Sequence, residues 1–355
     1  MNLNHTLLNC SHPMSTLMLN EALSAPLQVS LQLAYDATAY EAFAAQLRDR
    51  PPGGVVTVAR GSSDHAAAYL AYLVMSRTGQ LVTSLPMSLL TLYRAPVASS
   101  GLLAITVSQS GRSVDLIEPM QTFKQAGAIT VALVNDAASP LARAVEWCMP
   151  LHAGAEKSVA ATKSFICSLV AAARLSAHWP VGEHSDLMQA LQCLPQALEH
   201  ACRQDWSSAV EVLSRTERLM VIGRGPGLAI AQEAALKFKE TCGIQAEAFS
   251  SAEVKHGPMA LVGADYPMLV FAPRGPAQAG LIALAAEMRM RGAHVLLAAP
   301  PGVAERQLTL TPAPHPDLDP ITAIQSFYLL VEAVSRARGL NPDTPPHLAK
   351  VTSTR

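Results

Sequence analysis

Two hydroxyl-rich turns in the first half of the chain follow apolar segments that have the character of buried strands. Residues 108–113 (SQSGRS) contain three serines, and residues 61–64 (GSSD) contain two more. Hydroxyl groups and the backbone N–H groups at the start of a helix together form a local anion site, and a phosphate fits such a site. A serine-rich helix cap is the alternative interpretation, but residues 108–113 hold more hydroxyls than a cap needs. We therefore favour phosphate binding at these turns.

The second half of the chain carries charged side chains instead. Lys237 and Glu240 lie three residues apart in an otherwise apolar helical segment, so they share one face of the helix. Spacing alone favours a surface ion pair at the end of that helix. His256 precedes Gly257-Pro258, a turn that would fix the position of its ring. A single histidine is usually structural, but beside a carboxylate it is the natural proton donor at neutral pH.

Two further polar segments are open to more than one interpretation. Residues 156–163 (EKSVAATK) precede an apolar helical segment and are either a capping segment or a wall of the site. Lys350 lies near the end of the chain, where a lysine is usually solvated. Taken together, the polar residues predict a phosphorylated substrate and a proton-transfer reaction, whereas their spacing alone does not identify the sugar.

The elements that must hold these residues occur twice along the chain. An apolar strand, a glycine-containing turn and an alanine-rich helix in the first half return in the second. Two pairs of positions carry the match: Arg60-Gly61 with Arg224-Gly225 at an offset of 164 residues, and Gly127-Ala128 with Gly292-Ala293 at an offset of 165. Two matches at nearly one spacing indicate a duplicated domain built from βαβ units.

The strands and helices of each copy predict an α/β fold class. Short strands that are apolar throughout belong in a parallel sheet covered on both faces. We expect two tandem doubly wound, flavodoxin-like sheets, with ligands at the carboxyl ends of the strands. The predicted parts are an N-terminal tail with helices (1–50), a first sugar-phosphate-binding domain (51–180), a helical connector (181–205), a second domain with the charged residues (206–339) and a C-terminal tail carrying Lys350 (340–355).

The composition excludes several classes of protein. Half of the residues are hydrophobic and 15% are charged, which allows a large core and excludes disorder for most of the chain. The formal net charge of −1 provides no global field for nucleic acid or an anionic membrane surface. No apolar run is long enough to span a membrane. We therefore expect a small-molecule partner and a local anion site.

The cysteines and the N-terminus point to a cytoplasmic protein. Six scattered cysteines form no CxxC pair and no zinc-type spacing, so reduced thiols are expected and no metal ligands. No dinucleotide fingerprint follows the first strand, so no nucleotide cofactor is expected. The first residues have no basic segment followed by an apolar core, which argues against a signal peptide, and either Met1 or Met14 is the start.

Five motifs give these residues a family resemblance. SQSG, SVAATKSF, ALKFKE, EVKHGP and LAKVT occur in this order along the chain. Together they resemble the SIS (sugar isomerase) family, with two SIS domains in tandem from the region of residues 20–23 to Lys350. The likeness is strongest to the isomerase half of glucosamine-6-phosphate synthase and to SIS-type amino-sugar-phosphate deaminases. The resemblance implies a homodimer that acts on a phosphorylated amino sugar without a cofactor.

The resemblance also implies a role for each motif. The implied sugar-phosphate loop is Ser108, Gln109, Ser110 and Ser113, with Ser62 and Ser63 beside it, and the stretch that lines the sugar is Val159, Ala160 and Ala161. Ala161 replaces a serine of the synthase. Glu240 is the implied base that moves a proton between C1 and C2, and Lys237 supports the reacting end. His256 is implied to assist ring opening from the neighbouring subunit. Lys350 matches a lysine that can form a Schiff base with an open-chain ketose, although the synthase's adjacent tail residues differ here.

The expected reaction follows from what precedes the first domain. About fifty residues are too few for the glutaminase domain of the synthase, and Cys10 is not N-terminal. We therefore expect the releasing direction, in which glucosamine 6-phosphate becomes fructose 6-phosphate and ammonia. A galactosamine-6-phosphate deaminase or a fructosamine-6-phosphate deglycase is an alternative with the same parts. A non-catalytic phosphosugar sensor is an alternative of another class, but no helix-turn-helix segment precedes the first domain.

Overall fold

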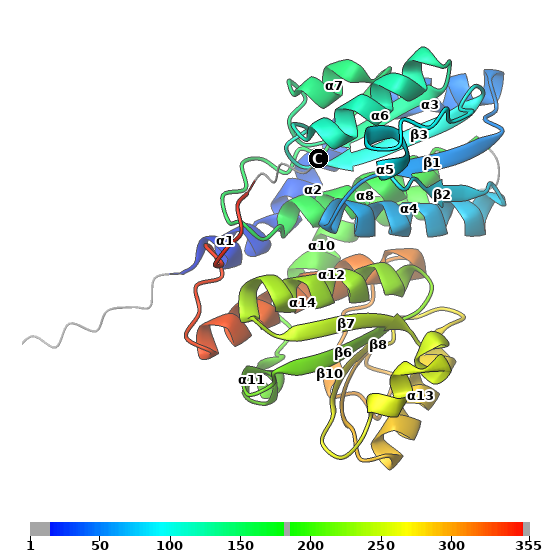
Figure 1. Ribbon diagram of the computed structural model, residues 1–355. Coiled ribbons are helices and arrows are strands. Elements are labelled where there is room, and N and C mark those ends of the chain that lie inside the picture. The colour runs from blue at the N-terminus through cyan, green and yellow to red at the C-terminus, as the bar shows by residue number, and fades with distance from the viewer. Residues whose placement is uncertain (1–14, 181–184, 351–355) are drawn as a thin grey trace, which may run out of the picture.

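Two parallel sheets of five strands form the centres of the two halves of the chain (Figure 1). The structure is a computed structural model that describes residues 15–180 and 185–350, so Met1, Met14 and Cys10 lie outside the described residues. The first sheet contains β1 (Gly54–Val58), β2 (Val82–Ser84), β3 (Leu102–Ser108), β4 (Ile129–Val134) and β5 (Trp147–Pro150). The second contains β6 (Arg218–Gly223), β7 (Gln245–Ser250), β8 (Pro267–Phe271), β9 (His294–Ala299) and β10 (Leu308–Thr309).

The two sheets have the same topology. The first has the order β2-β1-β3-β4-β5, and the second, read from its β7 edge, has the order β7-β6-β8-β9-β10. Every neighbouring pair is parallel, with β1 beside β3 in the first sheet and β6 beside β8 in the second. The predicted fold class of two tandem doubly wound sheets is therefore confirmed. In such a sheet the strand order reverses between these two neighbours, and ligands bind at the carboxyl ends there.

Helices cover both faces of each sheet. In the first half these are α4 (Ser62–Thr78), α5 (Ser88–Thr91), α6 (Val114–Gln125), α7 (Pro140–Ala144) and α8 (Lys163–Ala177). In the second half they are α11 (Ser207–Ser214), α12 (Pro226–Cys242), α13 (Gln278–Met290) and α14 (Asp319–Ala337), with short 3-10 turns η1 (Glu253–His256), η2 (Pro258–Leu261) and η3 (Pro316–Leu318). Strands thus alternate with helices along each half, as the doubly wound fold requires.

A layer of helices lies between the two sheets and joins the halves. Figure 1 shows α4 and α8 facing α12 and α14, and α4 contacts α12 directly. All fifteen residues of α8 are buried. Most residues of α8 are apolar, as a helix covered on every side requires, and the buried Arg174 is satisfied by the carbonyls of Gln32 and Tyr35. The layer therefore places residues of α4 and α12 side by side although they are far apart in the sequence.

Short helices outside the two sheets complete the join. The N-terminal helices are α1 (Leu17–Leu23), α2 (Ala25–Ala34) and α3 (Ala37–Asp49), and α9 (Ser185–Gln192) and α10 (Leu194–Ala201) link the halves. Two buried amides fasten the N-terminal helices: Gln325 of α14 donates to the Ala22 carbonyl, and Gln32 donates to the Cys167 carbonyl. The N-terminal segment is thereby fixed to helices of both halves.

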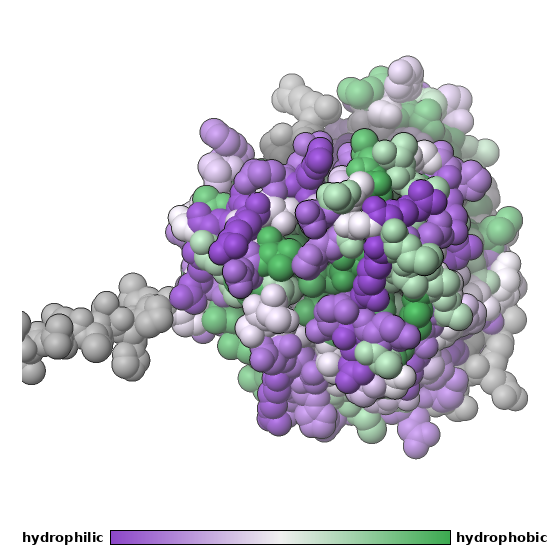
Figure 2. Space-filling view, turned by 90° about the horizontal axis from the view of Figure 1, so that it is seen from below, coloured by the Kyte–Doolittle hydropathy of each residue, from purple (hydrophilic) through white to green (hydrophobic). Residues whose placement is uncertain are grey.

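The outer surface has no single chemical character. The face seen from below in Figure 2 mixes hydrophilic with hydrophobic residues over the second half. Scattered exposed apolar side chains are normal for a folded protein. Within the described residues, no helix is both long enough and apolar enough to cross a membrane.

At Gly223, the end of β6 comes very close to the start of α12. A Cβ at this position would overlap the backbone carbonyl of Gly227, which cannot move without shifting the start of α12. Gly223→Ala should lower the free energy of unfolding by about 2–3 kcal/mol through overpacking, measured by urea denaturation. Gly280→Ala is the matched control, because its Cβ meets nothing within 4 Å. Equal stability of the two variants would contradict this close approach.

Candidate active site

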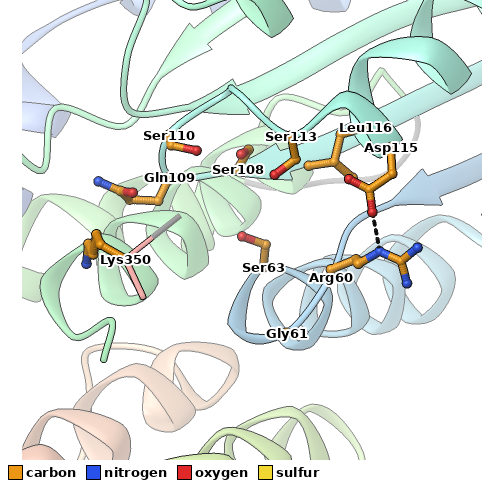
Figure 3. A pocket seen from close by; sticks show the side chains of 10 residues that line it. All are labelled: Arg60, Gly61, Ser63, Ser108, Gln109, Ser110, Ser113, Asp115, Leu116 and Lys350. Atoms are coloured by element: carbon orange, nitrogen blue, oxygen red, sulfur yellow. Dashed lines mark hydrogen bonds and ion pairs between the residues drawn. The ribbon is translucent and has the colours of Figure 1, made fainter. Parts of the chain in front are cut away.

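A cavity of about 300 Å³ opens at the carboxyl ends of β1 and β3. Figure 3 shows the hydroxyls of Ser63 and Ser113 pointing toward one another across it. Its lining consists of Arg60, Gly61, Ser63, Ser108, Gln109, Ser110, Ser113, Asp115, Leu116 and Lys350. The structure therefore brings five of the six predicted phosphate-binding residues into one cavity, together with the C-terminal lysine.

The loop after β3 is shaped by hydrogen bonds of its own serines. The Ser108 hydroxyl accepts the N–H of Gly111 at 3.1 Å, which turns the chain directly after the strand. Gly111 has φ 62, and a Cβ there would collide with Ser139. Only glycine fits a position that is both left-handed and crowded. Ser113 occupies the N-cap of α6, but its hydroxyl makes no capping hydrogen bond. Capping thus does not account for the Ser113 hydroxyl, which faces the cavity.

The first turn of α4 forms the opposite wall. Gly61 is its N-cap with φ 55, and no side chain caps this helix. The first N–H groups of a helix lack intrahelical partners and attract anions. Ser62 and Ser63 follow Gly61, and the two hydroxyls serve different places: Ser63 lines the cavity, whereas Ser62 bonds to residues of α12. The α4 terminus therefore connects the cavity with the second half.

Lys237 on α12 is buried, which corrects the expectation of a surface ion pair. Its side chain is 1% exposed, and its ammonium lies 2.5 Å from Glu240 and 3.2 Å from Glu233. The Lys237 ammonium also donates to the Ser62 hydroxyl at 3.2 Å. Spacing along the helix could not reveal that α4 of the other half covers this face. The predicted Lys237–Glu240 pair is therefore linked to the serine turn at residues 61–64 by a direct hydrogen bond.

Glu233 is a site residue that the sequence analysis missed. Its buried carboxylate accepts hydrogen bonds from Ser62 at 3.0 Å and Tyr328 at 3.1 Å, and it pairs with His65 at 2.9 Å. Burial raises the pKa of Glu233, but the Lys237 ammonium and the hydrogen bonds from His65 and Ser62 lower it more, to about 2. The available signal was a carboxylate four residues before Lys237, a spacing that many ordinary helix pairs share.

The C-terminal tail reaches the cavity through Lys350. Its ammonium donates to the carboxylate of Glu156 at 3.0 Å and to the carbonyl of Ser158 at 2.7 Å. Glu156 is fully buried, so residues 156–163 are more than a capping segment. Burial raises the pKa of the Glu156 carboxyl, but the charge of Lys350 and hydrogen bonds from Ser164 and Thr162 hold it below its usual range. The tail lysine is therefore not simply solvated.

The remaining predicted residues lie outside the cavity lining. Val159 donates its N–H to the Asp343 carbonyl of the tail at 3.1 Å, whereas Ala160 is buried and Ala161 is half-buried. Val159, Ala160 and Ala161 thus lie between the tail and the start of α8. His256 ends η1 with an exposed side chain, and Glu240 is half-buried on α12. The single chain does not bring His256 into the cavity.

Arg60 and Asp115 are further cavity residues that the sequence analysis did not assign to the site. The Arg60 guanidinium binds Asp115 at 2.5 Å, as the dashed line in Figure 3 shows. Arg60 is half exposed, whereas the Asp115 side chain is buried. In the sequence Arg60 marks the repeat, together with Gly61. Its charge could have indicated an anion site, since it directly precedes a turn of hydroxyls.

The second sheet has an internal ion pair where the first has serines. Arg274 follows β8 at the place that corresponds to the loop after β3, and its guanidinium binds Asp319 at 2.6 Å. The Asp319 carboxylate also accepts the backbone N–H groups of Arg274 and Ala313 at 3.0 and 2.8 Å. The guanidinium and the backbone N–H of Arg274 in this turn are therefore already bound by the Asp319 carboxylate. Within residues 15–180 and 185–350, no three His, Cys, Asp or Glu side chains are grouped to hold a metal ion.

A family model for the SIS domain matches this architecture at residues 51–175 and 212–299. The chain belongs to the SIS domain family. The two matched segments lie in the two halves that the repeat predicted, and the resemblance drawn from the five motifs is confirmed. The SIS family assignment covers the cavity turns at residues 61–64 and 108–113 as well as Lys237 and Glu240 on α12.

Several SIS relatives are similar over most of the chain. A protein of Silicibacter pomeroyi assigned as a phosphosugar isomerase is 42% identical, with a TM-score of 0.87 over 93% of this chain and 100% of that one. The glutamine–fructose-6-phosphate aminotransferase (isomerizing) of Thermus thermophilus is 32% identical over 83% of this chain. The match covers 51% of that enzyme, so the chain spans about half the length of the curated relatives it matches.

Two further solved structures define how widely the fold is shared. The C-terminal domain of the glucosamine-fructose-6-phosphate aminotransferase of Francisella tularensis is 25% identical, with a TM-score of 0.84 over 94% of this chain and 99% of that one. The glucosamine-6-phosphate deaminase of Thermotoga maritima is 21% identical, with a TM-score of 0.75 over 96% of this chain and all of that one. This last likeness is one of fold.

The buried cluster around Lys237 predicts a pH dependence of stability. Because the pKa of Glu233 falls from 4.5 to about 2 on folding, its charge stabilises the folded chain above pH 4.5. This contribution is lost as the pH falls from about 4.5 toward 2. Glu233→Gln should lower the free energy of unfolding by about 3 kcal/mol at pH 7, because it breaks a buried ion pair. Urea denaturation at several pH values measures the difference.

The exposed pair Glu211–Arg215 supplies the control for this prediction. Both side chains are more than 70% exposed, so Glu211→Gln should change stability little at any pH. The stability gap between the native chain and Glu233→Gln should narrow below pH 4.5. A gap that stays constant down to pH 3 would show that folding does not lower the pKa of Glu233.

Proposed function

We propose that the chain converts glucosamine 6-phosphate into fructose 6-phosphate and ammonia by a deaminating aldose–ketose isomerisation. The observation that carries this proposal is the link from the cavity to the carboxylate. Ser63 lines the cavity, and the adjacent Ser62 binds Lys237, which in turn binds Glu240. A ligand anchored by phosphate at the serine turns would have its other end directed toward the Lys237–Glu240 pair.

The cavity suits a phosphate monoester with a hydroxylated body. Hydroxyls of Ser63, Ser108, Ser110 and Ser113 surround it, the N–H groups of Gly61 and Ser62 lie at the start of α4, and Lys350 adds a positive charge. Phosphate bound there contributes binding energy remote from the reacting carbons, which positions the sugar for proton transfer. The relatives named as aminotransferases act on fructose 6-phosphate and are isomerising, which supports this class of substrate.

The proposed chemistry uses the Glu240 carboxylate as a base. In the open-chain amino aldose, Glu240 takes the proton from C2 and returns it to C1, while the amine nitrogen loses one proton, O1 gains one and a C2=N bond forms. Water then adds at C2 and ammonia leaves, which gives the ketose. The Lys237 ammonium, 2.5 Å from Glu240, would stabilise negative charge that develops at the C1 end.

His256 would assist ring opening from a second copy of the chain. Its side chain is exposed at the end of η1, where it is accessible to another subunit. A histidine is suited to this step because it both donates and accepts protons near neutral pH. We propose a homodimer in which each site receives His256 from the partner, in line with the resemblance described above.

The first experiment follows ammonia and fructose 6-phosphate together after the purified chain is mixed with glucosamine 6-phosphate. Equal release of both supports the deaminase. Isomerised sugar without ammonia would indicate a simple isomerase instead. Galactosamine 6-phosphate and 6-phosphorylated fructosamine adducts, assayed in parallel, separate the two related activities, and saturable binding without turnover would favour a sensor.

Glu240 and the cavity serines should affect different kinetic constants. Glu240→Gln removes the base, so kcat should fall by roughly 100-fold or more while fructose 6-phosphate still binds.

Ser110→Ala with Ser113→Ala should instead raise KM, because these hydroxyls would bind phosphate equally in the ground and transition states. Ser100→Ala is the control and should change neither constant, because Ser100 is exposed and precedes the start of β3. Normal turnover in Glu240→Gln would remove it as the base.

A further inference from the structure

The lining of the cavity contains a pair of opposite charges that the proton transfer just described does not use. The Arg60 guanidinium donates through Nε to the Asp115 carboxylate at 2.5 Å, and both side chains line the cavity. Figure 3 shows this pair on the opposite side of the cavity from Gln109 and Lys350. The Arg60–Asp115 pair therefore determines the charge at its own end of the cavity, apart from the C-terminal tail.

Asp115 is a buried carboxylate in the wall of a cavity that we expect to hold an anion. Its side chain is 6% exposed, and it lies in the first turn of α6. The N-terminus of a helix stabilises a negative charge there, whether that charge belongs to an aspartate or to a ligand. An uncompensated Asp115 would repel a phosphate from the same place. Phosphate binding therefore requires a positive charge beside Asp115.

Arg60 supplies this positive charge from the opposite wall. It directly precedes Gly61, the N-cap of α4, and an arginine side chain keeps its charge in a protein. Its Nε contacts Asp115, whereas its two terminal nitrogens point away from Ser63 in Figure 3. Arg60 thus neutralises the carboxylate, and the serine hydroxyls remain the groups that face the centre of the cavity.

The second copy of the domain shows that the shared topology does not require this pair. Arg224 repeats Arg60 in the sequence. At the offsets of the repeat, however, Asp115 corresponds to Ala279 or Gly280, and neither residue can form an ion pair. The carboxylate is therefore specific to the copy whose turns carry the serines.

We propose that Arg60 sets the charge selectivity of the cavity: its guanidinium cancels the charge of Asp115 and thereby allows a dianionic phosphate ester to bind. The inference rests on the proposed function for the phosphate itself and names the residue that determines its acceptance. The electrostatic energy of a dianion changes twice as much with each nearby charge as that of a monoanion of the same shape. Loss of Arg60 should therefore weaken a phosphate ester more than a sulfate ester.

Fructose 6-phosphate and fructose 6-sulfate are the probes, and calorimetry at about pH 8 measures their dissociation constants. At this pH the phosphate carries close to two charges, whereas a sulfate ester carries one. Arg60→Met should weaken binding of the phosphate roughly tenfold and of the sulfate about threefold, a size that allows for solvent screening at the half-exposed arginine. Equal losses for the two probes would overturn the proposal.

Asp115→Asn makes the opposite change in charge. It should tighten binding of the phosphate roughly tenfold and of the sulfate about threefold, and the double variant should bind both probes about as well as the native chain. Weaker phosphate binding in Asp115→Asn would mean that the pair only holds the two turns in place, which would overturn the proposal. This variant decides the question even if Arg60→Met, which leaves a buried carboxylate unpaired, fails to fold.

Arg94→Met is the matched control. Arg94 also reaches a carboxylate of α6, that of Glu118 at 3.5 Å, but neither residue belongs to the lining of the cavity. Both probes should bind to this variant as they do to the native chain. Equal changes in Arg94→Met and Arg60→Met would show that loosening of α6 is the cause, and that result would contradict a local charge effect.

Binding is measured without turnover, so this test and the deaminase assay give separate outcomes. The expected changes in the phosphate-to-sulfate ratio without any ammonia release would support the inference and reject the deaminase. Ammonia release by the native chain, together with an unchanged ratio in Arg60→Met, would reject the inference alone. Failure of the native chain to bind either ester would reject both.

Discussion

The proposed active site depends on the ion pairs and the hydrogen bond of the buried Lys237 ammonium. It lies where α12 of the second half meets α4 of the first, and its partners are Glu233, Glu240 and Ser62. A buried charge is tolerated only when it is paired and hydrogen-bonded. The Lys237 ammonium therefore fixes the positions of both the Glu240 carboxylate and the Ser62 hydroxyl. A shift between the two halves would separate Glu240 from the serine turn at residues 61–64.

Much of the architecture was predictable because its signals are local. Apolar strands, glycine turns and apolar helices return at a nearly fixed offset, and the hydroxyls of residues 108–113 follow directly after a strand. The contacts that complete the site are not local. Glu156 and Lys350 are 194 residues apart, and Ser62 and Glu233 are 171 apart. Nothing near Lys237 in the sequence shows that another helix covers it, so a surface ion pair was the reasonable but wrong expectation.

The tail and the N-terminal helices serve the site from outside the two sheets. Asp343 joins the tail to α1, and Glu21 of α1 joins that helix to the segment before α8. Glu21 is buried and Asp343 is half-buried, and backbone N–H groups satisfy both carboxylates. The wall of the cavity that carries Lys350 is therefore built from three segments that are remote in sequence. Its geometry forms only when both halves and both ends of the described chain are in place.

The Arg274–Asp319 pair gives the duplication a functional meaning. In the first copy, the turn after β3 presents serine hydroxyls to the cavity. In the second copy, the equivalent turn after β8 is occupied by the Arg274–Asp319 ion pair. In the proposed function, two domains of the same topology therefore provide one binding place per chain within the described residues. The second copy instead holds the Glu233 carboxylate of α12 against α4 of the first copy. In the proposed function the chain is an internal heterodimer, in which one repeat holds the ligand and the other supplies the chemistry.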